Sequence, residues 1–354
     1  MRLKPPVVPR SPSPHMIRTL LAISLFVTGT AHAEPPVLGQ GDFRYQLVEG
    51  WAAEALQSVS IKNGHSMAID KSGRILFLTD DPKNNIVILN AAGSLITTWT
   101  ARMPGAHGMT LTEENGSEVL FITDTVLHEV RKLTLDGKEL AVYPCPDSTG
   151  LYAKPAEYKP SKVVMLPGGG FCVFDGYGKD YVHHYQADGT LLRSWGGNLG
   201  EGENQLAHFG PHGGGLDLRD PANPVLLVCM SDKLEVKRFT PEGQFIDKFA
   251  MPGGNPRDAV LFGDNLFIPH LSDNWPADKK APGFVSVLDQ QNRVISNIGA
   301  TAAEYDAAGN LQPMKSLGAP FIHPHGIAVD KEGNLYVAQF ASPAAPLLKF
   351  QRVR

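Results

Sequence analysis

The 354-residue chain has few cysteines and no large excess of either charge, and each shortage excludes a class of protein. Its three cysteines are too few for the disulfide framework that holds many small exported domains together. Cys172 and Cys229 lie inside apolar runs, which favours buried free thiols, whereas one disulfide that involves Cys145 stays open. The formal net charge is -4 at pH 7, with Lys and Arg spread along the chain, so no basic patch points to a nucleic-acid partner.

Long apolar runs are also absent after the N-terminal region, where residues 20–30 form an apolar run behind a basic flank. This run is shorter than the roughly 18 apolar residues that a membrane helix needs, and no later run reaches that length. Small residues end the region at Ala33, as they do before a signal-peptide cleavage site. We therefore expect a signal peptide and N-terminal extension over residues 1–33, cleavage after Ala33, and a secreted or periplasmic protein without a membrane span. Residues 34–42 should be a short exposed leader.

Helical periodicity is scarce, and short β-rich runs recur about every ten residues between Gly, Asp, Asn and Pro. One phrase is repeated: a polar residue, most often histidine, just before an apolar strand. The six equivalent positions are His65, His107, Ser161, His212, Arg257 and His325. Successive positions are 42 to 68 residues apart (107 − 65 and 325 − 257), which leaves room for four strands in each repeat. We predict an all-β six-bladed β-propeller over residues 43–354.

The sixth repeat is one strand short, because the chain ends soon after the apolar stretch around Phe350. The β-rich residues 43–48 are the natural source of the missing strand. We expect them to join both ends of the chain in one sheet, which closes the ring and removes open sheet edges.

Residues just before the inner strands of a propeller gather at one mouth of its central channel. His107, His212 and His325 belong to alternate blades, so we expect them to form a triangle around the axis. Three imidazoles leave a fourth position open, which is typical of a catalytic Zn²⁺ site, although other divalent transition metals suit the same ligands. The alternative is that each histidine only hydrogen-bonds a neighbouring blade.

The residue after each histidine separates the four copies into two kinds. Glycine follows the three triangle histidines, at Gly108, Gly213 and Gly326, and glycine lets backbone or ligand approach closely. His65 is followed by Ser66 and lies in an odd-numbered blade. For His65 a substrate contact and a purely structural role are both open.

Two segments resemble a known family, the NHL-repeat propeller of peptidyl-α-hydroxyglycine α-amidating lyase, also named peptidylamidoglycolate lyase. They are residues 106–133, with Ala-His-Gly-Met and Phe-Ile-Thr-Asp, and residues 174–179, Phe-Asp-Gly-Tyr-Gly-Lys. The likeness covers residues 64–350. It implies an NHL-type propeller in which a zinc ion is held by three histidines and a tyrosine acts as base, cleaving a carbinolamide to an amide and glyoxylate. On this chain it implies His107, His212 and His325 as ligands and Tyr177 as the base.

The chain departs from that family at three places. Lys62 stands near the position of a first-blade arginine, and residues 230–235, Met-Ser-Asp-Lys-Leu-Glu, lack two further arginines. Gly326 replaces an acidic residue that holds a structural calcium ion, so Ca²⁺ is not favoured here. Arg257, in the fifth ring position, could bind a carboxylate from the cavity or form a salt bridge around Asp258.

The leading hypothesis is an exported, metal-dependent, lyase-like propeller that cleaves a carbinolamide-type small molecule or peptide end in its central channel. Tyr177 would be the base, with Arg257 and His65 as substrate contacts, and the protein would act as a monomer. One alternative is a non-catalytic NHL propeller that binds a peptide or glycan on its top face. Another is a calcium-dependent lactonase-like propeller, which requires Glu, Asp and Asn at the channel rather than histidine.

Overall fold

The computed structural model describes residues 1–7, 9, 34–199, 202–206 and 209–354. The chain forms two units, residues 1–34 and 35–354, and the second contains all the helices and strands of the described residues. Most of the expected signal peptide, including the cleavage site after Ala33, lies outside the described residues. Signal peptide and localisation therefore stay predictions.

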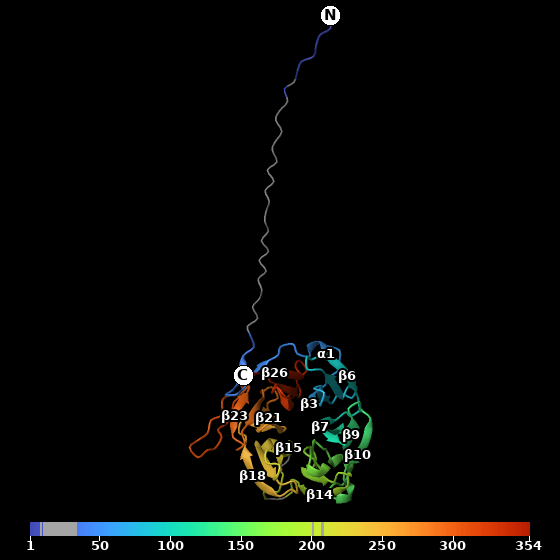
Figure 1. The fold of residues 1–354 in the computed structure, drawn as a ribbon, viewed down its shortest axis with the longest axis vertical. Helices are drawn as coiled ribbons and strands as arrows, with labels where there is room; N and C mark the ends of the chain where they lie inside the picture. The colour runs from blue at the N-terminus through green and yellow to red at the C-terminus, as the bar shows by residue number, and fades with distance from the viewer. Residues whose placement is uncertain (8, 10–33, 200–201, 207–208) are drawn as a thin grey trace. The chain divides into compact units, whose positions relative to one another are not determined.

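The second unit is a ring of six antiparallel sheets, the blades of a propeller, as predicted (Figure 1). The first blade contains β3 (Gly64–Ile69), β4 (Ile75–Thr79), β5 (Ile86–Leu89) and β6 (Leu95–Trp99). The second contains β7 (Ala106–Glu114), β8 (Ser117–Asp124), β9 (Glu129–Thr134) and β10 (Glu139–Pro144). The third contains β11 (Lys162–Met165), β12 (Phe171–Phe174), β13 (Tyr181–Tyr185) and β14 (Leu191–Gly196). The fourth blade contains β15 (Pro211–Asp217), β16 (Val225–Met230), β17 (Glu235–Phe239) and β18 (Phe245–Ala250). The fifth contains β19 (Gly254–Pro256), β20 (Val260–Phe262), β21 (Asn265–Ser272), β22 (Phe284–Leu288) and β23 (Val294–Ile298). The sixth is β24 (Pro324–Val329), β25 (Leu335–Gln339) and β26 (Leu347–Val353) with β1 (Val37–Gln40) and β2 (Phe43–Leu47).

Helical structure is confined to the connections between strands. One short α-helix, α1 (Ala53–Gln57), follows β2, and four single turns of 3-10 helix occur among the described residues. These turns are Asp147–Thr149, Pro155–Glu157, Pro167–Gly169 and Ser231–Lys233. Among the described residues, no helix is long and apolar enough to span a membrane.

Burial explains why the middle strands of each blade are apolar on both faces while the outer strands are mixed. Every residue of β4 and β12 is buried, because neighbouring blades cover both faces of the sheet, whereas β6 at the rim is mostly exposed. Each blade thus packs on the next through clusters such as Leu76 and Ile88 against Leu120 and Ile122. All three cysteines are free and buried, which confirms the prediction for Cys172 and Cys229 and leaves Cys145 without a disulfide.

The two ends of the chain meet in the sixth sheet, and the predicted closing strand is confirmed. β2 pairs with β26, with Arg44 opposite Val353 and Leu47 opposite Phe350. The prediction of an exposed leader over residues 34–42 is wrong for β1, which pairs with β2 as a fifth strand. Leu38 of β1 is buried, and the strand packs against β23 of the neighbouring blade. An apolar side chain and free backbone groups at a sheet edge account for this pairing.

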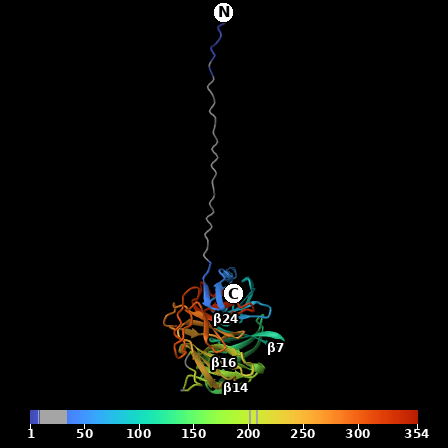
Figure 2. The same ribbon diagram turned by 60° about the vertical axis from the view of Figure 1, so that its left-hand side comes forward.

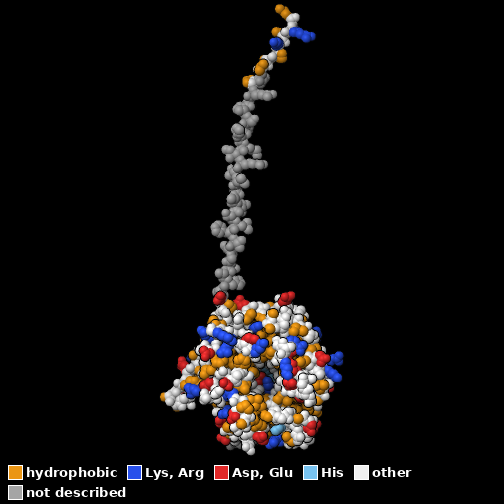
Figure 3. All heavy atoms as spheres, in the orientation of Figure 1, with side chains coloured by type: hydrophobic (Ala, Val, Ile, Leu, Met, Phe, Trp, Pro, Cys, Tyr) orange, Lys and Arg blue, Asp and Glu red, His pale blue; other side chains and the backbone are white. Residues whose placement is uncertain are grey.

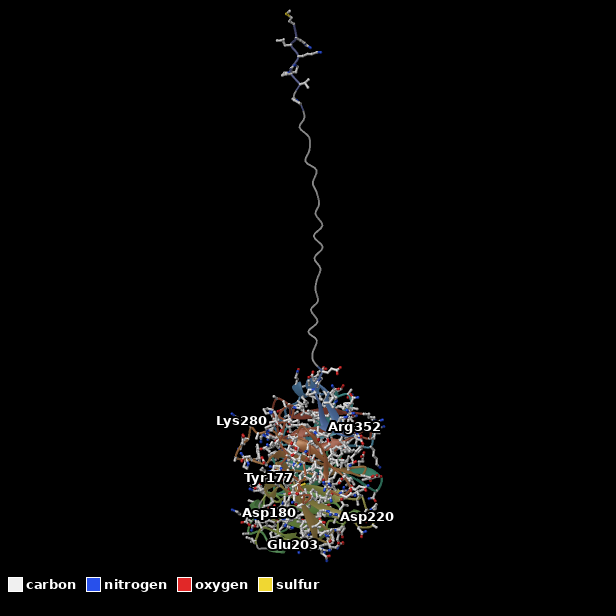
Figure 4. All side chains as sticks on the ribbon, turned by 90° about the vertical axis from the view of Figure 1, so that its left-hand side faces the viewer. Tyr177, Asp180, Glu203, Asp220, Lys280 and Arg352 are labelled. Atoms are coloured by element: carbon white, nitrogen blue, oxygen red, sulfur yellow. The ribbon has the colours of Figure 1, made fainter. Side chains whose placement is uncertain are left out.

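The inner strands surround the central channel. β3, β7, β11, β15, β20 and β24 contact one another in turn, and β24 contacts β3 to complete the circle. Figure 2 shows the same blades from the side, and the face seen in Figure 3 is hollowed near its centre. In Figure 4, Tyr177, Asp180 and Lys280 lie toward one side of the ring and Asp220 lies toward the other. Loops that connect inner to second strands and loops that leave the second strands thus occupy opposite faces.

Candidate metal centre

Each of the four histidines lies at the second position of an inner strand, where strand pairing is interrupted. In β3, for example, Gly64 pairs with Thr79 and Ser66 pairs with Leu78, so His65 has no partner across the sheet. The same shift occurs at the histidines of β7, β15 and β24. Such bulges re-aim a side chain, here toward the channel. The repeat pattern predicted these histidines just before their strands, whereas the bulges make them part of the strands.

Three of these rings form a nearly equilateral triangle around the axis. The ring centroids of His107 and His212 are 4.9 Å apart, and those of His325 lie 4.8 Å from each of them. All three side chains are buried. The residues that alternate blades were expected to bring together do converge.

A hydrogen bond to the next blade fixes each of the three rings in the same way. In each case Nδ1 contacts the backbone carbonyl at the ring position of the following odd-numbered blade. The three contacts are His107 to Ser161 O (2.9 Å), His212 to Arg257 O (2.9 Å) and His325 to His65 O (2.8 Å). A carbonyl only accepts, so Nδ1 carries the proton and donates it, which leaves the Nε2 lone pair free for a metal.

The glycines after these histidines permit the same contacts. A Cβ atom on Gly108 would lie 2.3 Å from Ser161 O, on Gly213 2.1 Å from Arg257 O, and on Gly326 2.5 Å from His65 O. These oxygens are the ones that accept the histidine protons. Any other residue would therefore push away the carbonyl that orients the preceding ring.

His65 belongs to the cluster but is held differently. Its ring centroid lies 5.0 Å from those of His107 and His325. Its Nε2 lies 3.5 Å from Asp80 Oδ2, and its Nδ1 is buried without a hydrogen-bond partner among the residues that the structure describes. Burial alone would raise the pKa of Asp80, but hydrogen bonding and charge from His65, with Asn63 and Lys62, lower it to about 2, so this carboxylate is ionised.

The four histidines offer two overlapping sets of three, and one of these sets has ligand atoms close enough together, among the described residues, to hold a metal ion. Within the described residues, ring nitrogens of His65, His107 and His325 all lie within 4.8 Å of one another, and this group could bind a metal ion. The triangle replaces His65 with His212. All three rings of the triangle are tethered through Nδ1 and carry no proton on Nε2, whereas His65 is not tethered in this way, so the triangle remains the predicted ligand set.

Tyr177 projects from the loop after β12 into this cluster. Its hydroxyl lies 2.8 Å from His212 Nε2 and 3.1 Å from His107 Nε2. The hydroxyl has one proton for two nitrogens whose own protons are on Nδ1. One Nε2 lone pair therefore faces the phenol oxygen with no proton between them, an arrangement that a cation would relieve. The donor set consequently fits a metal ion.

A buried network behind Tyr177 fixes its loop. The Asp175 carboxylate accepts hydrogen bonds from the backbone N–H groups of Lys159 (2.6 Å) and Lys179 (2.7 Å). It also accepts one from the Tyr152 hydroxyl at 2.7 Å, which in turn contacts His183 Nε2. These bonds hold Asp175 and Lys179 on either side of Tyr177, so they fix the backbone of the loop that positions the Tyr177 side chain.

Burial controls the protonation of the cluster. It is the main cause that lowers the pKa of His107, His212 and His325 well below 6.5, and the charge of Arg257 adds to the effect. The rings are therefore neutral near pH 7, the form that binds metals. Burial raises the pKa of Tyr177, and Arg257 opposes that shift.

Two cavities meet at this cluster. One, of about 200 Å³, is lined by Arg257, Leu271, Trp275 and His325, and the other, of about 540 Å³, by His65, Asp80, His107 and Lys159, among others. Tyr177, Phe209 and Phe340 line both cavities.

A salt bridge between Arg257 and the surroundings of Asp258 was one of two expectations for Arg257. Asp258 is paired with Lys162 instead, whose Nζ lies 2.8 Å from Asp258 Oδ2.

Several residues that line the site were not predicted from the sequence. Trp275 and Phe340 lie outside the repeated phrase and gave no signal. Asp80 and Asp175 did give one, because an apolar strand followed by aspartate recurs at residues 78–80, 122–124 and 173–175. That repetition places an aspartate at the end of the second strand in the first three blades.

Comparison with known proteins gives the fold but no family. No family model matches the chain, and no curated protein matches it. A streptogramin B lyase structure is 14% identical over 83% of this chain and 95% of its own, with a TM-score of 0.54. A catalytically inactive virginiamycin B lyase from Staphylococcus aureus, with quinupristin, is 12% identical over 90% of this chain and 100% of its own (TM-score 0.53). A luciferin-regenerating enzyme is 11% identical over 83% of this chain and 93% of its own (TM-score 0.53).

Proposed function

We propose that this chain is an exported, metal-dependent lyase that cleaves a carbinolamide-type bond, as in an α-hydroxyglycine amide. The observation that carries the proposal is the Tyr177 hydroxyl between the Nε2 atoms of His107 and His212, at 3.1 and 2.8 Å. Similar folds include proteins named as lyases, which supports the reaction class. The likeness to amidating lyase supports the finer substrate assignment.

His107, His212 and His325 would hold the metal through Nε2, with Nδ1 tethered to the neighbouring blades. A zinc ion at such a site supplies Lewis acidity to a substrate oxygen. Other divalent transition metals would suit the same nitrogens.

Tyr177 would act as the base. In the reaction its phenolate oxygen takes the proton of the carbinol hydroxyl, the carbon–oxygen double bond forms, and the bond to the amide nitrogen breaks. The nitrogen leaves with the electron pair and takes up a proton. A neighbouring cation favours the phenolate and offsets the effect of burial on the pKa of Tyr177. Arg257 and His65 would contact the two ends of the substrate, since they line different cavities beside the tyrosine.

Metal analysis of the purified protein tests the ligand set. We expect about one equivalent of a transition metal in the wild type, less than about a tenth of an equivalent in His212→Ala, and retained metal in His65→Ala. The opposite result for the two variants would assign the metal to the His65 group. A wild-type protein that cannot be loaded with metal would reject the proposal and favour a non-catalytic propeller that binds a peptide or glycan.

A second experiment tests the base. Tyr177→Phe should retain metal but release glyoxylate from an α-hydroxyglycine amide about 10²- to 10⁴-fold more slowly than the wild type. Tyr45→Phe is the matched control, because the buried Tyr45 hydroxyl has no partner among the described residues. Equal rates in both variants and the wild type would exclude Tyr177 as the base.

A further inference from the structure

Arg257 is a buried cation whose hydrogen-bonding capacity is only partly used by the described residues. The residue is 5% exposed, and its Nε atom is buried without a hydrogen-bond partner among the described residues. The carboxylate next to it in sequence, Asp258, is engaged by Lys162 at 2.8 Å. A buried charged donor with an unmet hydrogen bond is costly, so a partner supplied by a ligand is the expected compensation.

The cavity that Arg257 lines has walls suited to an apolar group. Leu271, Trp275, Pro276 and Phe340 contribute to its lining, and the rings of Trp275 and Phe340 lie edge to face with centroids 5.7 Å apart. The cavity volume is about 200 Å³. These walls exceed what a bare carboxylate requires, because they offer apolar contact on several sides of the guanidinium.

One acidic residue also lines this cavity. This residue is Asp232. Burial lowers the pKa of Arg257, and the charges of Tyr177 and Asp232 raise it. Asp232 lies on the 3-10 turn Ser231–Lys233 and is exposed, whereas Arg257 is buried. The buried charge is the less screened of the two and sets the preference of the cavity for an anion.

We propose that this cavity binds an amphipathic carboxylate, in which the carboxylate meets Arg257 and an aromatic or branched aliphatic group lies against Trp275 and Phe340. The inference rests on the proposed function, because the cavity borders Tyr177 and His325 of the same site. It narrows the substrate class: an α-hydroxyglycine amide, which releases glyoxylate, is the minimal member, and the preferred acid fragment carries an apolar group in addition to its carboxylate. The larger cavity, with His65, Asp80 and Lys159, receives the amide-bearing fragment.

Calorimetric titration with small probes tests this without turnover. Benzoate should bind the protein as purified and also after chelation of metal, whereas acetate should bind at least about tenfold more weakly and benzylamine should not compete. Arg257→Gln should weaken benzoate binding about tenfold to a hundredfold, in both metal states. Arg238→Gln is the control, since Arg238 pairs with the exposed Asp247 in the fourth blade.

Further variants guard against a folding defect. Trp275→Phe should weaken benzoate binding several-fold and leave acetate binding unchanged, because it shortens the apolar wall and keeps the cation. Arg257→Lys should retain weaker binding of benzoate, because a charge remains but the planar fork is lost. Circular dichroism and unfolding midpoints verify that each variant is folded.

The outcomes separate this proposal from the proposed function. Benzoate binding that requires metal but not Arg257, equal binding of acetate and benzoate, or preferred binding of benzylamine would each overturn the assignment of this cavity. Arg257-dependent benzoate binding in a protein that never takes up metal would support the cavity and reject the metal-dependent reaction. Metal uptake and lyase activity, together with benzoate binding that does not depend on Arg257, would support the metal-dependent reaction and reject the assignment of this cavity.

Discussion

The even-numbered blades and the first blade use the same residue, histidine, for different ends. In blades two, four and six the histidine is followed by glycine, and its Nδ1 is tethered to the next blade at 2.8 to 2.9 Å. In blade one Ser66 follows His65, the Nδ1 of His65 has no partner among the described residues, and Nε2 faces Asp80. Glycine thus follows the histidine in the three blades in which Nδ1 is hydrogen-bonded to the next blade, and serine follows it in the blade without that bond. The residue after the histidine therefore marks which rings are tethered through Nδ1.

The largest effect is expected from breaking one tether through its glycine. Gly213→Ala places a Cβ atom 2.1 Å from Arg257 O, the acceptor of the His212 proton. We expect the free energy of unfolding to fall by about 3 kcal/mol and the metal content to drop, because the carbonyl must move. Chemical denaturation and elemental analysis measure both quantities.

Ser66→Ala is the matched control, since it alters the equivalent position of blade one. It should keep its metal and lose no more than about 1 kcal/mol, the contribution of one hydrogen bond. Full metal content and unchanged stability in Gly213→Ala would contradict the role given to the tether.

An intermediate effect is expected from pH. The pKa of each triangle histidine is lowered well below 6.5 in the folded protein, chiefly by burial, whereas the unfolded chain titrates near that value. Above about pH 6.5 all three are neutral in both states and their stability contribution is fully present. As the pH falls further, only the unfolded chain takes up protons, so stability is lost by about 1.4 kcal/mol per pH unit for each histidine.

Denaturation of the metal-free protein between pH 7.5 and 5.5 measures this slope. Over this interval His212→Asn should lose about 1.4 kcal/mol less stability than the wild type, an average of about 0.7 kcal/mol per pH unit, because one proton-binding difference is removed. An identical slope in the variant and the wild type would show that His212 is not held neutral by burial.

The smallest effect is expected from a substitution in blade one that copies the His-Gly sequence of the even-numbered blades. Ser66→Gly gives blade one the His-Gly sequence but removes the bond from Ser66 Oγ to Met109 O (3.3 Å). We expect a loss of about 1 kcal/mol, from that bond and from the freedom of glycine in the unfolded chain, with metal content unchanged. A second bound metal equivalent would mean that glycine alone turns this position into a ligand.

Much of the fold could be predicted from sequence because its signals repeat. The His-Gly phrase fixed the blade register, and the missing strand of the last repeat identified residues 43–48 as the closing strand. The pairing of β1 was missed, because the edge that it covers is created only when the ring closes. Local pattern carries no information about such an edge.

The site was predictable only where it followed the repeat. The convergence of the triangle came from blade register, and Tyr177 came from likeness to a family. The pairing of Lys162 with Asp258 and the wall formed by Trp275 and Phe340 depend on contacts between different blades. Such contacts between distant segments leave no periodic trace in the sequence.

The contact from His325 Nδ1 to His65 O joins the inner strand β24 of the last blade to the inner strand β3 of the first. The third imidazole is therefore oriented by a residue made 260 positions earlier. During synthesis the cluster therefore stays incomplete until β24, which carries His325, has been made. A variant without β26 would lose the pairing that joins β2 to the sixth blade, the sheet whose inner strand holds the His325 ring in place.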